Sequence, residues 1–406
     1  MIYAFILGKN TALSVAEIIS VLKRESFVFV TLSISAKSFI IKTDKEISDP
    51  RLFLNRLGGT IKIAEIFSTD DSSYKTKILD HVINNPRDSK FVFGLSTYGL
   101  TNNKAGFEIK KELKKNNISS RLVEGKSNQP LSAPEIKNNK IIEKGADFVL
   151  IKNKDSLFIG NTIAIQDYES YSYRDYDRPR RNAKSGMLPP KVAQAMINLV
   201  PNNPDDPIII YDPFCGNGTV LQEAALMNYK IIGSDISPER IYDTEKNLEW
   251  LEREYSLNID NPKNILFAKD ALTISKKDFS IIPNNIVSEV YLGPPLSGHQ
   301  ERNNILEIVN SLEKKYVDFI KNLHDKLGNI DSIVLAIPFY ITRKELFFLN
   351  IIDDIKKNGY NVISPLGNTD FSFDFLQEEY SKERETVLYS REDQMVGREI
   401  IILKRK

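Results

Sequence analysis

Short apolar runs and one amphipathic segment alternate at the start of the chain. The runs Ile2–Leu7, Phe27–Leu32 and Ser38–Ile41 have the length and residue types of strands. Between the first two, Ser14 and Glu17 have the spacing of a capping box ahead of helically spaced apolar residues. The pattern therefore predicts a small α+β domain, with a helix that begins near Ser14.

The pattern restarts near Ile61 and predicts a second α+β module. Strands are predicted at Phe91–Leu95 and Phe148–Ile151, around a lysine-rich helix near Phe107–Lys115. Residues Gln166–Ser185 then show little apolar periodicity and mix tyrosines with arginines. This composition is typical either of a solvated connector or of a strip that contacts nucleic acid, and the pattern leaves both open.

The rest of the chain alternates between strand and helix patterns, after a helix that opens at Pro189-Pro190. Such alternation predicts a mostly parallel sheet covered by helices on both faces, hence a doubly wound α/β unit. The predicted organisation is an N-terminal ferredoxin-like α+β domain at 1–62, a second α+β domain at 63–167, a linker at 168–182 and the α/β domain at 183–406.

Composition narrows the class of protein. The chain has 406 residues, of which 41% are hydrophobic and 27% charged, as is ordinary for a folded, water-soluble protein. One cysteine and three histidines are too few for a disulfide framework or a closed structural zinc site, so no metal is expected. A net charge of +1 excludes a uniformly basic protein but not a basic patch. The first residues resemble neither a signal peptide nor a membrane span, so we expect a cytoplasmic location without membrane association.

The strongest local signal is the loop Asp212–Thr219, which follows a buried strand and precedes a helix. Glycines in such a loop let a ligand approach the backbone, and the helix N-terminus favours a negatively charged group. The loop has neither the third glycine of a dinucleotide fingerprint nor the Gly-Lys-Ser/Thr of a phosphate loop. It resembles motif I of S-adenosylmethionine-dependent methyltransferases that modify amino groups, with Asn217 in place of serine.

Two later strand ends also carry an aspartate. The resemblance implies that Asp235 binds the ribose of the cofactor and that Asp270 binds its adenine amino group. One aspartate alone is more often a helix cap or a turn residue, but three in this order favour ligands. The residues predicted to bind S-adenosyl-L-methionine are Asp212, Phe214, Gly216, Asn217, Gly218, Thr219, Asp235, Ile236, Asp270, Ala271 and Glu289.

The fourth strand end, Ser288–Pro295, departs from the Asp/Asn-Pro-Pro-aromatic motif that such enzymes usually carry. That motif accepts hydrogen bonds from a poorly nucleophilic amine and holds it in line with the methyl group. Ungapped alignment places Glu289 at the acceptor position and leaves Tyr291 to stack on the base. The shifted alignment, on Gly293–Leu296, supplies neither an acceptor nor a ring. Glu289 and Tyr291 are therefore the predicted catalytic residues, and a degraded, inactive motif is the alternative.

The resemblance extends beyond this domain. Phe93–Ser96, Leu131–Pro134 and Gly160–Asp167 resemble the THUMP RNA-binding module, and Arg174–Pro179 and Ser185–Pro190 resemble its junction with the catalytic domain. Motif order and domain order together are similar to the tRNA guanine-10 N2-methyltransferase family. The resemblance implies a Rossmann-like methyltransferase domain with a mixed seven-stranded sheet, preceded by small α+β N-terminal and THUMP domains.

The function implied by the resemblance is methylation of the exocyclic N2 amine of a tRNA guanine, at position ten, by direct in-line transfer to a flipped base. The alternatives are a catalytically impaired RNA-binding paralogue that keeps the cofactor pocket, and a methyltransferase for another RNA or DNA amine. A monomer or weak dimer is expected, and the need for an activating protein subunit stays open. The basic residues predicted to contact tRNA are Lys104, Lys110, Lys111, Lys114, Arg121, Arg178, Arg180, Arg181 and Lys184.

Overall fold

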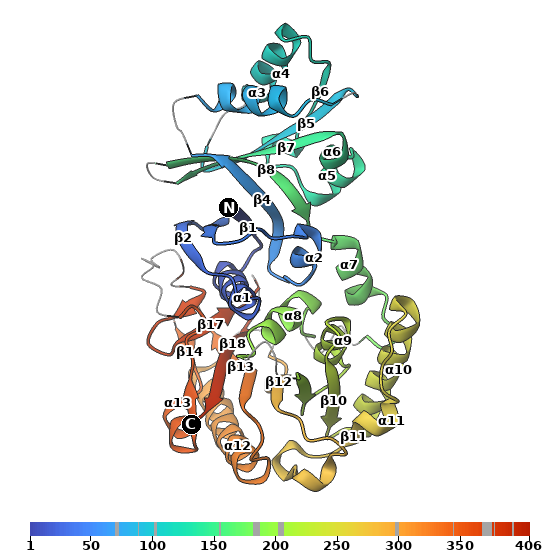
Figure 1. Ribbon diagram of the computed structural model, residues 1–406. Helices are drawn as coiled ribbons and strands as arrows, with labels where there is room; N and C mark the ends of the chain where they lie inside the picture. The colour runs from blue at the N-terminus through green and yellow to red at the C-terminus, as the bar shows by residue number, and fades with distance from the viewer. Residues whose placement is uncertain are drawn as a thin grey trace. The chain divides into compact units, whose positions relative to one another are not determined.

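The computed structural model describes residues 1–69, 73–87, 89–100, 104–153, 156–181, 187–201, 207–296, 300–343, 345–367, 376, 378–391 and 394–406. Two compact units are present (Figure 1). The first contains Met1–Thr11, Ser26–Arg56 and Thr60–Tyr168, and the second contains Ala12–Glu25, Leu57–Gly59 and Glu169–Lys406. In the described part of the chain, no helix combines the length and apolar character needed to cross a membrane.

The first unit is built on one eight-stranded sheet with the order β2-β3-β1-β4-β8-β7-β5-β6. Its strands are β1 (Ile2–Leu7), β2 (Phe29–Ile34), β3 (Ser38–Thr43), β4 (Thr60–Ser68), β5 (Phe91–Tyr98), β6 (Ser120–Val123), β7 (Gly145–Asn153) and β8 (Ser156–Ile165). Its helices are α2 (Pro50–Asn55), α3 (Tyr74–Asn84), α4 (Ala105–Lys115), α5 (Ala133–Asn138) and α6 (Ile141–Lys144).

Strand β4 joins the two modules that the sequence predicted as separate domains. It pairs with β1 on one side and with β8 on the other, so the predicted boundary between 62 and 63 falls inside a strand. The buried Lys62 ammonium lies 3.0 Å from the buried Asp147 carboxylate, which also accepts hydrogen bonds from Ser96 and Thr162. Since a buried charge is costly without a partner, this cluster ties β4, β5, β7 and β8 together.

The second unit contains a ten-stranded sheet with the main order β11-β10-β9-β12-β13-β18-β17-β16, in which β14 pairs with β13 and β15 with β18. Its strands are β9 (Ile209–Asp212), β10 (Lys230–Asp235), β11 (Leu266–Ala268), β12 (Asn285–Glu289), β13 (Ser332–Ile341), β14 (Leu346–Phe347), β15 (Tyr360–Val362), β16 (Tyr380–Ser381), β17 (Thr386–Tyr389) and β18 (Val396–Arg405). The strands from β11 to β13 are parallel, whereas β18 is antiparallel to β13. The predicted Rossmann-like mixed sheet is thus confirmed, and β14, β16 and β17 add to the seven strands expected.

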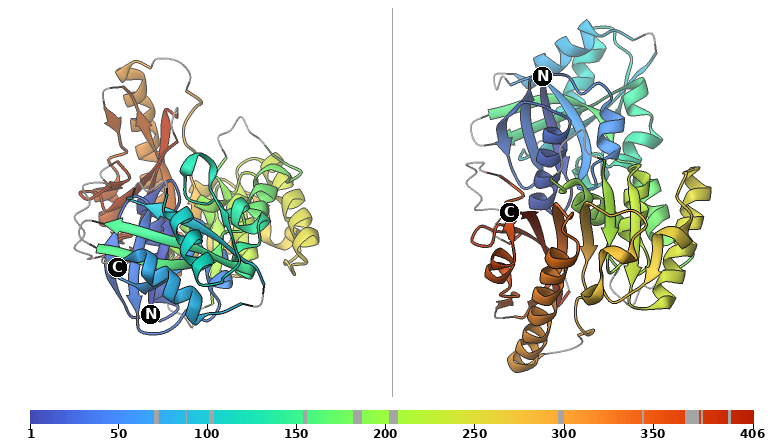
Figure 2. Two further views of the ribbon diagram at one scale, coloured as in Figure 1. Left: turned by 90° about the horizontal axis from the view of Figure 1, so that it is seen from above. Right: turned by 60° about the horizontal axis from the view of Figure 1, so that its bottom comes forward.

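Helices pack on this sheet and are α8 (Pro190–Asn198), α9 (Thr219–Leu226), α10 (Pro238–Tyr255), α11 (Pro262–Ile265), α12 (Arg302–Lys326) and α13 (Ile352–Lys357). The long helix α12, orange in Figure 2, shares one hydrophobic core with Tyr211, Ile286 and Ile333 of the central strands. The alternate residues Ile210 and Val287 are also fully buried, on the opposite face. Burial on both faces is what a parallel sheet requires.

Two local predictions differ from the structure. Helix α1 spans Thr11–Arg24, so Ser14 and Glu17 lie inside it, and the predicted capping box is wrong. Both side chains bind residues distant in sequence instead: Ser14 donates to the Gly59 carbonyl, and Glu17 accepts from the Gly58 and Gly59 N–H groups. The predicted linker contains helix α7 (Tyr168–Tyr176). Its buried residues are Tyr171 and Arg174, so it lacks the stripe of apolar residues by which a helix is predicted from sequence.

Candidate functional site

Four acidic side chains follow one edge of the second unit's sheet. Strands β11, β10, β9 and β12 are neighbours and parallel, so their carboxyl ends meet at the same edge. Asp235, Asp212 and Glu289 are the last residues of β10, β9 and β12, and Asp270 lies two residues beyond β11. The acidic residues therefore occur along the edge in the order Asp270, Asp235, Asp212, Glu289.

Asp212 is buried at the base of the loop that leads into α9. Its Oδ1 accepts hydrogen bonds from Ser288 Oγ at 2.6 Å and from the Phe214 N–H at 3.1 Å. Burial raises the pKa of Asp212 to about 7, and the two hydrogen bonds oppose that rise. The carboxyl of Asp212 therefore titrates near neutral pH. A nearby cation would favour its ionised form, which is the stronger hydrogen-bond acceptor.

The loop that follows Asp212 has a tightly fixed backbone. Asp235 Oδ2 accepts from the Gly216 N–H at 3.1 Å, which couples the ends of β9 and β10. Gly218 has φ +80° at the start of α9, and a Cβ there would lie 2.8 Å from Thr244 Cγ2. Cys215 is buried, and burial raises the pKa of its thiol. These properties favour a role as a small packing residue over a reactive thiol.

Sequence reasoning missed three residues that brace this loop. Thr244 of α10 donates to the Gly216 carbonyl at 2.8 Å, and Asn247 donates to the Asn217 carbonyl at 2.8 Å. Ser288 holds Asp212 from the neighbouring strand. Thr244 and Asn247 are three residues apart on the buried face of α10. Two polar residues at positions where a helix usually carries apolar ones could have indicated their role from the sequence.

The adenine side of the predicted site is more open. Ile236 is 71% exposed directly after Asp235, which leaves an apolar surface at the sheet edge. Asp270 caps a short helical turn by accepting from the Leu272 N–H at 3.0 Å, while Ala271 is buried beneath it. The side-chain position of Asp270 is therefore set by the cap, and Ile236 is the surface on which a flat ring could lie.

Glu289 is paired with a residue that sequence reasoning did not assign to the site. Its carboxylate Oε1 forms an ion pair with Nε of Arg398 on β18, and only 3% of the arginine side chain is exposed. Burial raises the pKa of Glu289, and Arg398 opposes that rise. Nearby, the residue Tyr291 is 53% exposed. The fourth strand end thus combines a half-buried carboxylate with an accessible aromatic ring.

The predicted RNA contacts fall in different settings. Arg178 is only 3% exposed and donates to Thr219 Oγ1 at 2.7 Å, so the structure assigns it to supporting the start of α9 rather than to an RNA surface. Arg180 and Arg181 are exposed, and the Arg181 guanidinium lies 4.8 Å from the centre of the Tyr176 ring. Lys184 lies outside the described residues. In the first unit, the remaining predicted contacts are all exposed: Lys104, Lys110, Lys111, Lys114 and Arg121.

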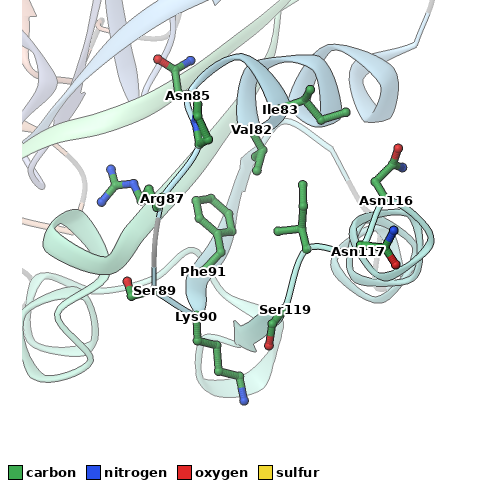
Figure 3. Close-up of a pocket in the computed structure, with 12 residues that line it drawn as sticks. Val82, Ile83, Asn85, Arg87, Ser89, Lys90, Phe91, Asn116, Asn117 and Ser119 are labelled. Atoms are coloured by element: carbon green, nitrogen blue, oxygen red, sulfur yellow. The ribbon is translucent and has the colours of Figure 1, made fainter.

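A surface pocket of about 550 Å³ lies in the first unit, where α3 and α4 end and β5 and β6 begin. Figure 3 shows Phe91 facing its interior, while Arg87 and Lys90 point outward. The pocket contains none of the residues predicted to carry chemistry. Among the described residues of the whole chain, no group of three or more His, Cys, Asp or Glu side chains is arranged to hold a metal ion.

Comparison with known proteins finds a family match to part of the second unit. Residues 178–266 match the family described as the RMKL-like methyltransferase domain. That match includes the strand ends at Asp212 and Asp235 and stops before Asp270 and Glu289.

Two curated relatives resemble part of the chain. The tRNA (guanine(10)-N2)-dimethyltransferase of Methanocaldococcus jannaschii is 38% identical over 109 residues, which are 27% of this chain and 28% of that protein. The enzyme of the same name from Methanothermobacter thermautotrophicus is 30% identical over 161 residues, 40% of this chain and 41% of that protein. The matches thus cover less than half of either relative, and they confirm the sequence resemblance to this family.

The whole fold has a counterpart among solved structures. The crystal structure of TrmN from Thermus thermophilus covers 100% of both chains with a TM-score of 0.52 and 12% sequence identity. At that identity the likeness concerns the fold alone.

Proposed function

We propose that the protein is an S-adenosyl-L-methionine-dependent tRNA methyltransferase that modifies the N2 amine of a guanine, at position ten. The observation that carries this proposal is the spatial order of the four acidic residues along one sheet edge. An extended cofactor laid along that edge would meet Asp270 with its adenine, Asp235 with its ribose and Asp212 with its methionine end. Glu289, the next residue of the row, would act on the amine that receives the methyl group.

The residues present fit such a cofactor. Gly216 has φ +53°, and a Cβ built there would have only the Phe214 carbonyl oxygen within 4 Å, at 3.9 Å, so a ligand can approach the loop backbone. Burial raises the pKa of Asp212, and an ammonium group bound beside it would stabilise the ionised carboxylate. The exposed Ile236 offers an apolar surface for an adenine ring. When bound, the cofactor supplies an electrophilic methyl group; the chain supplies the alignment.

Glu289 and Tyr291 would act on the target base. A guanine amine is conjugated to its ring and is therefore a weak nucleophile, so hydrogen bonds from its N–H groups to Glu289 would orient its lone pair. The exposed Tyr291 ring would stack on the flipped base. Arg398 would keep Glu289 ionised, because an unpaired half-buried carboxyl would protonate more readily.

The first unit would hold the tRNA. Its exposed lysines on and before α4 present positive charge from one helix, although Lys75 pairs with Glu108 on that helix. Structured RNA is read largely through shape and backbone, so such a surface could fix the distance to one guanine.

One assay tests this proposal directly. The full chain is incubated with unmodified tRNA and cofactor labelled in the methyl group, and the nucleosides are analysed by mass spectrometry. N2-methylguanosine is expected, and it should be lost in Glu289→Gln while calorimetric binding of S-adenosylhomocysteine persists. Methylated adenine or cytosine, or full activity of Glu289→Gln, would contradict the proposal.

A second candidate is a catalytically impaired RNA-binding protein that retains the cofactor pocket. The ion pair between Glu289 and Arg398 favours it, because a carboxylate held by arginine is a weaker acceptor for an amine. Calorimetric binding of the cofactor product and of tRNA, without methyl transfer to any tRNA, would support this candidate.

A further inference from the structure

The two positions directly after β12 lack the prolines of the usual motif, although Pro294 and Pro295 follow a few residues later. Residues Val290, Tyr291 and Leu292 stand where the usual motif has Pro-Pro-aromatic. Proline fixes φ near −65°, so a proline pair keeps a loop rigid without any outside contact. Without prolines directly after Glu289, residues 290–292 must be held by other groups if they are to present Glu289 and Tyr291 in one geometry.

Two tyrosine hydroxyls hold this segment from outside. Tyr316 of α12 donates a hydrogen bond to the Tyr291 carbonyl, and Tyr340 of β13 donates to the Leu292 carbonyl at 3.0 Å. The Val290 N–H donates to the Ala336 carbonyl at 3.2 Å, which continues the pairing with β13. Three consecutive residues are thus each fixed through the backbone, while the residue Tyr291 is 53% exposed.

The environment of the two hydroxyls suits a permanent donor. Tyr316 and Tyr340 are 3% and 0% exposed and belong to the hydrophobic core beneath the sheet edge. Burial raises the pKa of both phenols, so the hydroxyls stay protonated. Gly293 has φ +90°, and a Cβ there would lie 2.5 Å from Tyr340 Oη. The glycine is therefore required by the same close approach.

We propose that Tyr316 and Tyr340 are positioning residues that take over the role of the missing prolines and set the geometry of Glu289 and Tyr291. The inference rests on the proposed function, because it assigns these hydroxyls to the methyl-transfer step. In the described structure, the hydrogen bonds of the two hydroxyls go to the Tyr291 and Leu292 carbonyls and not to the loop Asp212–Thr219. Their loss should consequently change turnover and leave cofactor binding intact.

The test uses Tyr316→Phe, Tyr340→Phe and the double variant, all in the full chain. Each change removes one oxygen and keeps the ring in the core. Because a displacement of about 1 Å near the chemistry can cost roughly a hundredfold, we expect kcat to fall about tenfold per hydroxyl and about a hundredfold in the double variant. The KM for the cofactor and the Kd of S-adenosylhomocysteine should stay within about twofold, an ordinary range for sites that do not touch.

Tyr360→Phe provides the matched control. Its hydroxyl is also buried in the second unit, and it has no hydrogen-bond partner among the described residues. Removing it should leave kcat unchanged. A double variant with the kcat of the wild type would overturn the inference, as would a loss of cofactor affinity that parallels the loss of kcat.

Amide hydrogen exchange separates this inference from the proposed function. In the double variant, exchange over residues 290–293 should become at least about tenfold faster, with Tyr360→Phe unchanged. If the wild type transfers no methyl group to any tRNA, the proposed function fails, and unchanged exchange would overturn the hold on the loop separately. If the wild type is active and the double variant shows both faster exchange and a lower kcat, the proposed function and the further inference are both supported.

Discussion

Replacing Arg398 with methionine tests how far Glu289 depends on its buried partner. Only 3% of the arginine side chain and 20% of the glutamate side chain are exposed. Breaking a fully buried pair costs about 3–5 kcal/mol because one charge is left without compensation. Since Glu289 keeps some access to water, we expect a loss of about 2–3 kcal/mol in the free energy of unfolding at neutral pH.

The same change should move the pKa of Glu289. Burial already raises it and Arg398 opposes the rise, so removing Arg398 must raise it further. A carboxyl whose pKa is raised further stays protonated to a higher pH, and a protonated carboxyl accepts fewer hydrogen bonds. The acid limb of methyl transfer should therefore move to higher pH, and activity should recover as pH rises.

The assay combines urea unfolding with a pH profile of kcat. Arg384→Met is the matched control, because Arg384 forms a similar pair with the fully buried Glu399, with 2.6 Å between Nε and Oε1. The control should lose stability without moving the acid limb. A wild-type pH profile in Arg398→Met would refute the reasoning, and so would additive effects of Arg398→Met and Glu289→Gln on stability.

Three further predictions concern the second unit. Burial raises the pKa of Glu17 to about 7, so between about pH 4.5 and 7 the native state binds more protons than the unfolded state, and the free energy of unfolding falls as pH rises. Glu17→Gln should remove up to about 3 kcal/mol of this pH dependence, measured by urea unfolding at several pH values. The same pH dependence of unfolding in the variant and the wild type would contradict this prediction. Asp212→Asn should weaken calorimetric binding of S-adenosylhomocysteine by at least about tenfold, since hydrogen bonds to charged groups contribute about 1.5–3 kcal/mol, and unchanged affinity would remove Asp212 from the site. Gly218→Ala places a Cβ 2.8 Å from Thr244 at positive φ, which costs about 1–2 kcal/mol and should lower the melting temperature by about 2–8 °C; Gly216→Ala, in open space, should lose less, and the reverse order would be inconsistent with the loop geometry.

The acidic row at the sheet edge could be predicted because it depends on local patterns. Each carboxylate follows an apolar run, and parallel strands place their ends together. Helix α10, Pro238–Tyr255, shows the same locality. Proline lies in its first turn, and Ser256 leaves the helix in the left-handed region.

The features that sequence reasoning missed depend on distant partners. Strands β14 and β16 have two residues each, too few for a periodic pattern, and form only because β13 and β17 lie beside them. Glu17 matched a capping box by spacing, but the Gly58 and Gly59 N–H groups and the Asn198 amide compete for its carboxylate. Local spacing could not reveal this competition, because folding brings those donors to α1.

The Glu289–Arg398 pair belongs to the same class, since its members are 109 residues apart. Their strands are separated by β13, so the two backbones stand about 9–10 Å apart at the usual strand spacing. Only long side chains can meet across that gap. An aspartate, the usual residue of the motif, is one methylene shorter and would draw the carboxylate back from Arg398. The glutamate at position 289, which departs from the usual motif, is therefore long enough to reach the buried Arg398, which holds its carboxylate in place.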